Sequence, residues 1–223
     1  MQESTGTRIR ERASAGESRR EQRRVVRHDV ARHQLLDAAE EVFGDKGYHN
    51  TTLKEVAELA EFSVGSVYSF FESKDDLYLQ VFLRRGEEFL PGMEEAVTAG
   101  EEPLDQLHRL VDFEIGFFRN HPRFGRFYLR AAGTPVPGPE TPTSDELRAN
   151  FERAMEIHAA VFRAGQRSGA FREGDPRVLA RILSGIVLAY QSVDPVVPSP
   201  DVVAGQLPLE SLHQLVEGAF GSR

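Results

Sequence analysis

Small and hydroxyl-bearing residues begin a short segment of helical pattern at residues 64–71, and their types suit contact with a nucleic acid. Gly65 and Ser66 add little bulk there, so that the backbone can approach a phosphate. The free N–H groups and the positive dipole end of a helix both favour an anion. Tyr68 combines an apolar ring with a hydroxyl group that can reach a phosphate. These residues predict DNA contact by a short helix placed in the major groove.

A second pair of residues has the spacing of metal ligands. His108 and Asp112 stand at i and i+4 of one expected helix, which places both side chains on one face. The sequence shows no third ligand for them and no HExxH, GxSxG, P-loop or GxGxxG motif. The absence of cysteine excludes thiolate metal sites, disulfides and cysteine nucleophiles. We expect no enzyme, no metal and no cofactor; an enzyme, or a helical interaction module that does not bind DNA, is the alternative.

The elements that place Gly65 and Tyr68 are two short helices, over 52–60 and 64–71, joined by a turn of three residues. The first begins with the spacing of a capping box, and the second begins after Ser63, a good N-cap residue. This is the spacing of a helix-turn-helix. In that motif the first helix crosses the DNA backbone and the second enters the major groove.

The remaining pattern is helical almost throughout. A helix from residue 29 precedes the two short ones, and a long helix from Ser73 to Ala99 follows them. Apolar periodicity and prolines in first-turn positions indicate further helices near 103–119, 122–132, 144–167, 176–193 and 208–219. Two stretches rich in proline, 133–143 and 194–206, are expected loops. The predicted fold is all-α, with a three-helix unit joined by the long helix to a larger C-terminal helical domain.

Residues 1–27 differ in composition from the rest of the chain. They hold eight arginines and four glutamates but almost nothing apolar, so they cannot bury enough surface to fold. We interpret them as a disordered basic arm before a DNA-binding domain over 28–74 and a C-terminal domain over 75–223; a solvated tail is the alternative. The net charge of the chain is −8, and residues 28–78 have four basic and eleven acidic residues. DNA contact must therefore rest on a few placed groups, with the arm as a further source of positive charge.

The location of the protein follows from what the sequence lacks. No stretch approaches the roughly 18 consecutive apolar residues of a transmembrane helix. The arginine-rich N-terminus has no apolar segment of the kind that secretory signals contain. We expect a cytoplasmic protein with no membrane partner.

Residues 32–79 read RHQLLDAAEEVFGDKGYHNTTLKEVAELAEFSVGSVYSFFESKDDLYL. This string resembles the DNA-binding domain of the TetR (tetracycline-repressor-like, TetR/AcrR) family of bacterial transcription regulators. The similarity includes Phe43, the Gly47-Tyr48 pair, Val67-Tyr68 and Leu77. One departure is Glu61, which stands where the family often has glycine, so its backbone must accept the geometry of the turn.

The resemblance implies that DNA contacts come from the starts of both short helices and of the long helix. The positions so implied are Thr51, Lys54, Ser63, Val64, Gly65, Ser66, Tyr68 and Lys74. Phe70 stays open between contact with a thymine methyl group and packing in the core.

The resemblance also implies a C-terminal domain that binds a small molecule and forms a homodimer. The expected pocket wall is aromatic with one histidine, although core packing is the default interpretation of most of the same residues: Phe113, Phe117, Phe127, Phe151, His158 and Phe162. The expected dimer interface consists of apolar residues in the last two helices: Leu179, Ile182, Leu183, Ile186, Leu209, Leu212 and Val216.

The expected function combines these elements. It is that of a ligand-responsive, sequence-specific regulator, a repressor released from a palindromic operator when an unidentified effector binds. The expected partners are double-stranded DNA, a second copy of the chain and the effector. A two-fold dimer presents its recognition helices about 34–36 Å apart. Ligand and DNA are expected to favour different spacings, so that each weakens binding of the other.

Overall fold

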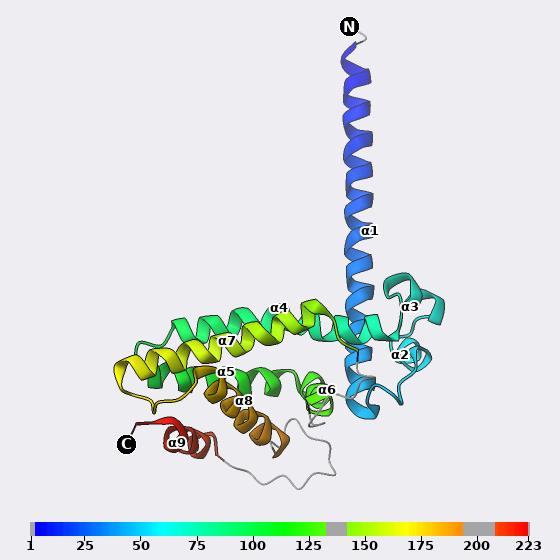
Figure 1. Ribbon diagram of the computed structural model, residues 1–223. Coiled ribbons are helices and arrows are strands. Elements are labelled where there is room, and N and C mark those ends of the chain that lie inside the picture. The colour runs from blue at the N-terminus through cyan, green and yellow to red at the C-terminus, as the bar shows by residue number, and fades with distance from the viewer. Residues whose placement is uncertain (1–2, 133–141, 194–207, 223) are drawn as a thin grey trace.

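The computed structural model describes residues 3–132, 142–193 and 208–222, and all the regular elements of these ranges are helices (Figure 1). In chain order they are α1 (Glu3–Lys46), α2 (Leu53–Leu59), α3 (Val64–Phe70), α4 (Lys74–Thr98), α5 (Pro103–Asn120), α6 (Pro122–Ala132), α7 (Asp145–Ser168), α8 (Pro176–Val193) and α9 (Leu209–Phe220). The prediction of an all-α fold is confirmed. The expected loops over 133–143 and 194–206 lie outside the described residues, apart from residues 142 and 143.

Helix α1 is where the structure departs most from the sequence-based expectation. The prediction of a disordered arm is wrong over residues 3–27, because Glu3–Lys46 form one helix. A lack of apolar residues prevents packing but not helix formation, since Arg, Glu, Gln and Ala are strong helix formers. Arg24 also donates to Glu21 one turn earlier, at 2.9 Å. Side chains from residue 20 to residue 30 are exposed, and this part of α1 projects away from the other helices (Figure 1).

The first of two hydrophobic clusters joins α2, α3 and the end of α1 to the beginning of α4 and to α6. At its centre the rings of Phe43, Tyr78, Phe82 and Phe127 form tilted or edge-to-face pairs, with centroids 4.4 to 5.9 Å apart. Such pairs contribute about 1 kcal/mol each beyond the burial of their area. Because Phe127 belongs to α6, the helix-turn-helix unit shares its core with the following domain.

The second cluster fills the space between the later part of α4 and helices α5, α7, α8 and α9. Helix α4 contributes to both clusters, with Leu77 and Val81 in the first and Leu90 and Met93 in the second. The prediction that a continuous helix joins the two parts of the chain is confirmed. The domain boundary between residues 74 and 75 stays a prediction.

Candidate functional site

Helix α2 begins with the capping box that the sequence predicts. The Thr52 hydroxyl accepts from the backbone N–H of Glu55 at 3.3 Å, and the Glu55 carboxylate accepts from the backbone N–H of Thr52 at 2.8 Å. Hydrogen bonds from Lys46 and from Thr52 lower the pKa of Glu55 to about 2. The carboxylate therefore stays charged at the N-terminus of α2, where the helix dipole favours a negative group.

The turn between α2 and α3 has the strained residue that the sequence predicts. Glu61 has a φ of 60° and is the one non-glycine residue with positive φ in the described ranges. The backbone N–H of Phe62 donates to the carbonyl of Ala57 at 2.8 Å, which closes the turn. A left-handed conformation costs an L-residue about 1–2 kcal/mol. The hydrogen bond that closes the turn thus holds the backbone of Glu61 in the left-handed region, which glycine adopts freely.

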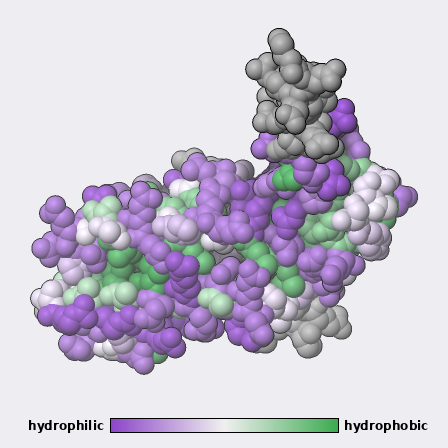
Figure 2. Space-filling model, turned by 90° about the horizontal axis from the view of Figure 1, so that it is seen from above, coloured by the Kyte–Doolittle hydropathy of each residue, from purple (hydrophilic) through white to green (hydrophobic). Residues whose placement is uncertain are grey.

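One face of α3 is exposed and carries most of the residues predicted to contact DNA. Val67 packs inward, whereas Ser63, Val64 and Gly65 are exposed and the side chain of Tyr68 is 58% exposed. The Ser63 hydroxyl caps the helix by accepting from the N–H of Ser66 at 3.0 Å. Figure 2 looks along α1 from its N-terminal side and shows pale, weakly hydrophobic side chains at the edge over α3, beside a mostly hydrophilic body. This face can enter a groove without desolvating charged groups.

The side chain of Phe70, left open by the sequence, packs. It is half-buried against the first cluster, and its ring lies 4.6 Å from that of His28 on α1. The base of the α1 projection therefore rests on the end of α3.

Thr51 does not belong to the exposed face, which corrects the prediction that it contacts DNA. The residue is 1% exposed, and its hydroxyl donates to the carbonyl of Gly47 at 2.8 Å. The hydroxyl satisfies a carbonyl beyond the end of α1, so it is not available to a phosphate.

The two lysines predicted to contact DNA have different environments. The Lys74 ammonium donates to the carbonyls of Tyr48 at 3.0 Å and Thr51 at 3.2 Å, and it lies 4.3 Å from the centroid of the Tyr48 ring. It thus ties the α1–α2 connection to the start of α4. Lys54 is exposed, and its ammonium lies 3.6 Å from Glu58 one turn later. Of the two, Lys54 is the one placed to meet a partner.

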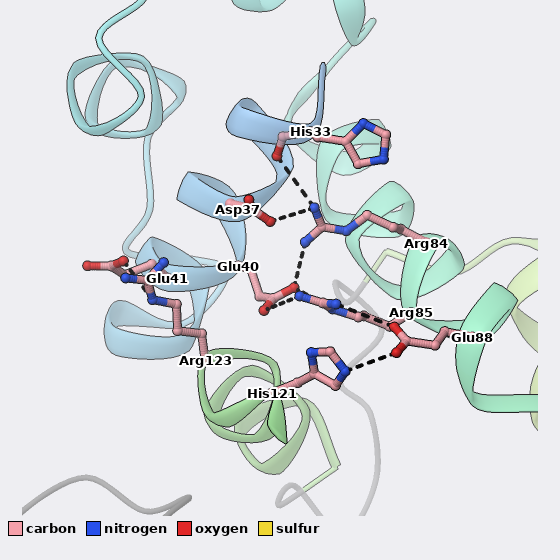
Figure 3. A network of polar contacts seen from close by, with 9 residues as sticks. All are labelled: His33, Asp37, Glu40, Glu41, Arg84, Arg85, Glu88, His121 and Arg123. Atoms are coloured by element: carbon pink, nitrogen blue, oxygen red, sulfur yellow. Dashed lines mark hydrogen bonds and ion pairs between the residues drawn. The ribbon is translucent and has the colours of Figure 1, made fainter. Parts of the chain in front are cut away.

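A network of charged groups joins α1 to α4 and α6, as Figure 3 shows. Its centre is the carboxylate of Glu40, 3% exposed, which accepts from Arg84 at 2.7 Å and from Arg85 at 2.9 and 3.0 Å. Arg84 also reaches Asp37 at 2.7 Å. On the α6 side, Arg123 lies 3.0 Å from Glu41. Sequence reasoning missed this network; the available signal was a glutamate between the apolar positions of Leu36 and Phe43.

The residues predicted to form the effector pocket are spread over both hydrophobic clusters, and their role as a pocket wall stays a prediction. Phe127 is in the first cluster and Phe162 in the second, where its ring lies 4.9 Å from that of Phe220. Phe113 and Phe117 pack with Phe89 of α4. Phe151 is exposed. Five of the six thus pack on neighbouring aromatic side chains, Phe151 on Phe82 with ring centroids 6.5 Å apart, as the core interpretation expected.

The sixth residue, His158, has a partner that the sequence did not reveal. Its Nε2 atom lies 2.5 Å from Oε1 of Glu114 on α5, and both residues are buried. Tyr128 of α6 is close by, and burial together with the Glu114 charge raises the pKa of that tyrosine to about 12. A buried carboxylate, a histidine and a tyrosine therefore lie between α5, α6 and α7. Glu114 stands on the apolar face of α5 next to Ile115, which was the available signal.

The predicted dimer residues divide between the interior and the surface. Four of them are core residues of their own chain, which corrects their assignment to the interface: Leu179, Leu183, Leu212 and Val216. Ile186 and Leu209 are half-buried, whereas Ile182 is 49% exposed. Ile182 belongs to an exposed stripe of apolar and small residues along α8, which comprises Val178, Ile182, Gly185, Ala189 and Val193. This stripe, rather than the buried set, is available to a second copy.

The pair with metal-like spacing links two helices. His108 lies 3.0 Å from Glu217 of α9, and Asp112 lies 2.7 Å from His213 of α9. The two histidine rings stack at 4.4 Å. Within the part of the chain that the structure describes, no group of three or more His, Cys, Asp and Glu residues is arranged to hold a metal ion. The pair thus fastens α9 to α5.

None of the described helices has the length and apolar composition needed to cross a membrane.

Comparison with known proteins supports the resemblance to the TetR family that the sequence shows. Residues 35–81 match the sequence model of a family described as bacterial regulatory proteins, tetR family. The HTH-type transcriptional activator FasR of Mycolicibacterium smegmatis is 34% identical over 116 residues; the match spans about half of either chain, 52% of each. The fatty acid metabolism regulator protein of Bacillus subtilis is 33% identical over 158 residues, or 69% of this chain and 78% of that protein. The solved structure of AibR in complex with isovaleryl coenzyme A and operator DNA has a TM-score of 0.67 at 18% identity and covers 85% of this chain and 97% of that one.

Proposed function

We propose, from the premise that this chain belongs to the tetR family of bacterial regulatory proteins, that it represses transcription and leaves its operator when an acyl-coenzyme A binds. That the chain is a DNA-binding regulator and not an enzyme follows from the family. The observation that carries the proposal is the exposed face of α3, where Val64, Gly65 and Tyr68 project beside the exposed Lys54 of α2.

Readout of the operator is assigned to these few groups. Lys54 and Ser66 are the polar candidates for base or phosphate contacts, and Val64 and Tyr68 supply apolar ones. With so few bidentate donors, the shape of the DNA contributes a large share of the specificity. Two copies that meet through the exposed stripe of α8 place two such faces on successive turns of a palindromic site.

We assign an acyl thioester as the ligand of the C-terminal domain. AibR was solved with isovaleryl coenzyme A, and the relative from Bacillus subtilis is named as a regulator of fatty acid metabolism. The aromatic side chains of α4 and α5, including Phe89, Phe113 and Phe117, are suited to an apolar acyl chain. The buried pair of Glu114 and His158 supplies polar groups for the thioester end.

Coupling between the two sites is assigned to the contact of α6 with α1. Arg123 lies 3.0 Å from Glu41, Arg126 lies 3.4 Å from Asp45, and Arg130 donates to the carbonyl of Gly44. A displacement of α6 on ligand binding therefore moves α1 and the α2–α3 pair that packs on it. Ligand and DNA then weaken each other by the same free energy.

The test begins with selection of genomic fragments bound by the full chain, followed by fluorescence anisotropy on the selected duplex. Tyr68→Ala is expected to abolish specific binding, and Tyr68→Phe to weaken it only by the loss of one hydroxyl contact. Acyl-coenzyme A esters of increasing chain length are then added, with free coenzyme A as the control. Release by an ester but not by coenzyme A supports the proposal. Tighter binding with an ester indicates an activator instead, and no effect of any ester rejects the assigned ligand class.

A further inference from the structure

The first 27 residues, most of which form the part of α1 that projects beyond α3, carry a net positive charge in a chain that is acidic overall. Residues 1–27 hold eight arginines against four glutamates, whereas residues 28–78 are strongly acidic. Figure 1 shows α1 running past α3 and away from the C-terminal helices. The ring contact between His28 and Phe70 fixes the base of this projection at the end of α3. The projection therefore begins at the surface assigned to DNA and leaves the body on that side.

The arginines of the described side chains share one face of this helix. Arg20, Arg23, Arg24 and Arg27 stand at i, i+3, i+4 and i+7 and are exposed. Because each residue advances the helix by about 100°, the four point within an arc of about 100°. The opposing acidic groups, Glu21 and Asp29, lie outside that arc. The result is a basic stripe rather than a mixed surface.

The cations of the helix-turn-helix itself already have partners inside the chain. In the described residues 28–78 these are Arg32 with Gln80, Lys46 with Glu55, Lys54 with Glu58, and Lys74 with the carbonyls of Tyr48 and Thr51. A DNA-binding protein draws much of its affinity from cations that displace counterions at phosphates. Arg24 of the basic stripe also pairs with Glu21, but the stripe adds four exposed arginines to this side of the molecule, and such surface pairs are weak competitors for a phosphate.

We propose that residues 3–27 of α1 form a second DNA-binding element, which lies against the phosphate backbone that flanks the groove entered by α3. This inference rests on the proposed function. From Val30 to Glu3 the helix is about 40 Å long at 1.5 Å per residue, and a duplex carries about one charge per 1.7 Å. The stripe of four arginines can therefore neutralise several phosphates. It contacts no base edges, so it adds affinity without sequence preference.

The test replaces Arg20, Arg23, Arg24 and Arg27 by glutamine in the full chain, which keeps helix propensity and removes four charges. The matched control replaces four exposed arginines of the C-terminal domain: Arg109, Arg148, Arg153 and Arg167. Binding is measured from 50 to 300 mM salt on the selected operator and on a scrambled duplex. We expect the arm variant to lower the slope of log K against log salt by about 3 to 4 on both duplexes, because each phosphate contact contributes about 0.9. The control variant is expected to leave the slope unchanged.

Equal slopes for the arm variant and the unmodified protein overturn this proposal, even if the operator is bound tightly. If the unmodified protein shows no sequence preference, the proposed regulator is rejected. The slope of log K against log salt on the scrambled duplex still tests the arm in that case. Binding to anionic phosphatidylglycerol vesicles, with unchanged slopes on DNA, assigns the stripe to a lipid surface and also overturns the proposal.

Discussion

The Nε2 atom of His158 lies 2.5 Å from Oε1 of Glu114, in the interior of the C-terminal domain. On its other side, Nδ1 of His158 lies 2.8 Å from the carbonyl of Ala154, which can only accept, so Nδ1 carries a hydrogen. A neutral imidazole with its hydrogen on Nδ1 and a carboxylate both present lone pairs at the short contact. The contact is satisfied when a proton is held between the two groups, as an imidazolium and a carboxylate.

Stability should therefore depend on pH through this pair. Burial lowers the pKa of His158, but the Glu114 charge and the hydrogen bonds to Glu114 and Ala154 raise it by more, so the pKa is above its usual value. The stabilisation is present below the pKa of an unfolded histidine, about 6.5, and is lost as pH rises through the raised value. In Glu114→Gln the burial, which is the largest effect, is opposed only by the hydrogen bond to Ala154, so stability should fall on acidification instead. Urea unfolding from pH 5.5 to 9 measures both trends, with the exposed Glu87→Gln as control.

Replacement of Glu61 by glycine should stabilise the protein. Relief of the left-handed conformation gains about 1–2 kcal/mol, and the greater freedom of glycine in the unfolded chain offsets about half of it. The net expectation is about 0.5–1 kcal/mol in thermal or urea unfolding. The same change at Glu87, exposed in the interior of α4, should destabilise by about 1 kcal/mol. A destabilised Glu61→Gly variant contradicts the strain inferred from the φ of 60°.

Substitution of Lys74 should change stability, whereas substitution of Lys54 should change DNA binding. Lys74→Ala removes two hydrogen bonds from a charged donor, so we expect a loss of about 2 kcal/mol in unfolding free energy. Lys54→Ala removes only an exposed pair with Glu58, worth less than about 0.5 kcal/mol, but lowers operator affinity. Unfolding and anisotropy measurements on both variants check this. Wild-type stability in Lys74→Ala shows that its contacts to the two carbonyls contribute little.

Glu40 and its neighbour Glu41 offer a matched comparison at the domain junction. Glu40→Gln removes the buried carboxylate that two half-buried arginines share and leaves them only their more exposed partners, and we expect a cost of about 3 kcal/mol. Glu41→Gln breaks a more exposed pair with Arg123 and should cost less than about 1 kcal/mol. Calorimetric unfolding of both variants decides whether the buried carboxylate holds the junction; equal costs indicate that it does not.

Ile182 and Leu183 are adjacent in α8 but should act on different properties. Ile182→Asp places a charge on the exposed stripe, so we expect the dimer to dissociate while the chain stays folded. Leu183→Ala empties part of the second cluster and should cost about 3 kcal/mol of stability without changing the association state. Analytical ultracentrifugation and urea unfolding separate the two effects. A dimer that persists in Ile182→Asp excludes this face as the interface.

The local features of the fold were largely predictable from the sequence. The capping box of Thr52, the N-cap of Ser63 and the turn strain at Glu61 each depend on residues within a few positions of one another. The helical face of α3 follows in the same way, because periodicity separates Val67 from Tyr68. Such features are encoded by neighbouring residues, and a single sequence contains them in full.

The misjudged features depend on partners that are distant in the chain. Glu40 meets Arg84 and Arg85 across two helices, and Glu114 meets His158 across another two. Periodicity indicates which face of a helix is apolar, but not which other helix covers it. Helix α8 is apolar on two sides, so the sequence alone did not separate the core residue Leu183 from the exposed Ile182. Thr51 is buried beneath the turn, so its hydroxyl cannot make the DNA contact that the family resemblance implied.

Glu40 and the arginine stripe lie on the same uninterrupted helix. A movement of α1 at the domain junction therefore also moves the stripe. Arg20 stands twenty residues before Glu40, which is about 30 Å along the helix axis. A tilt of α1 by roughly 10° about its anchored end therefore displaces Arg20 by roughly 5 Å, more than the length of a hydrogen bond. A small rearrangement of the side chains in Figure 3 thus becomes a displacement of several ångströms at the arginine stripe.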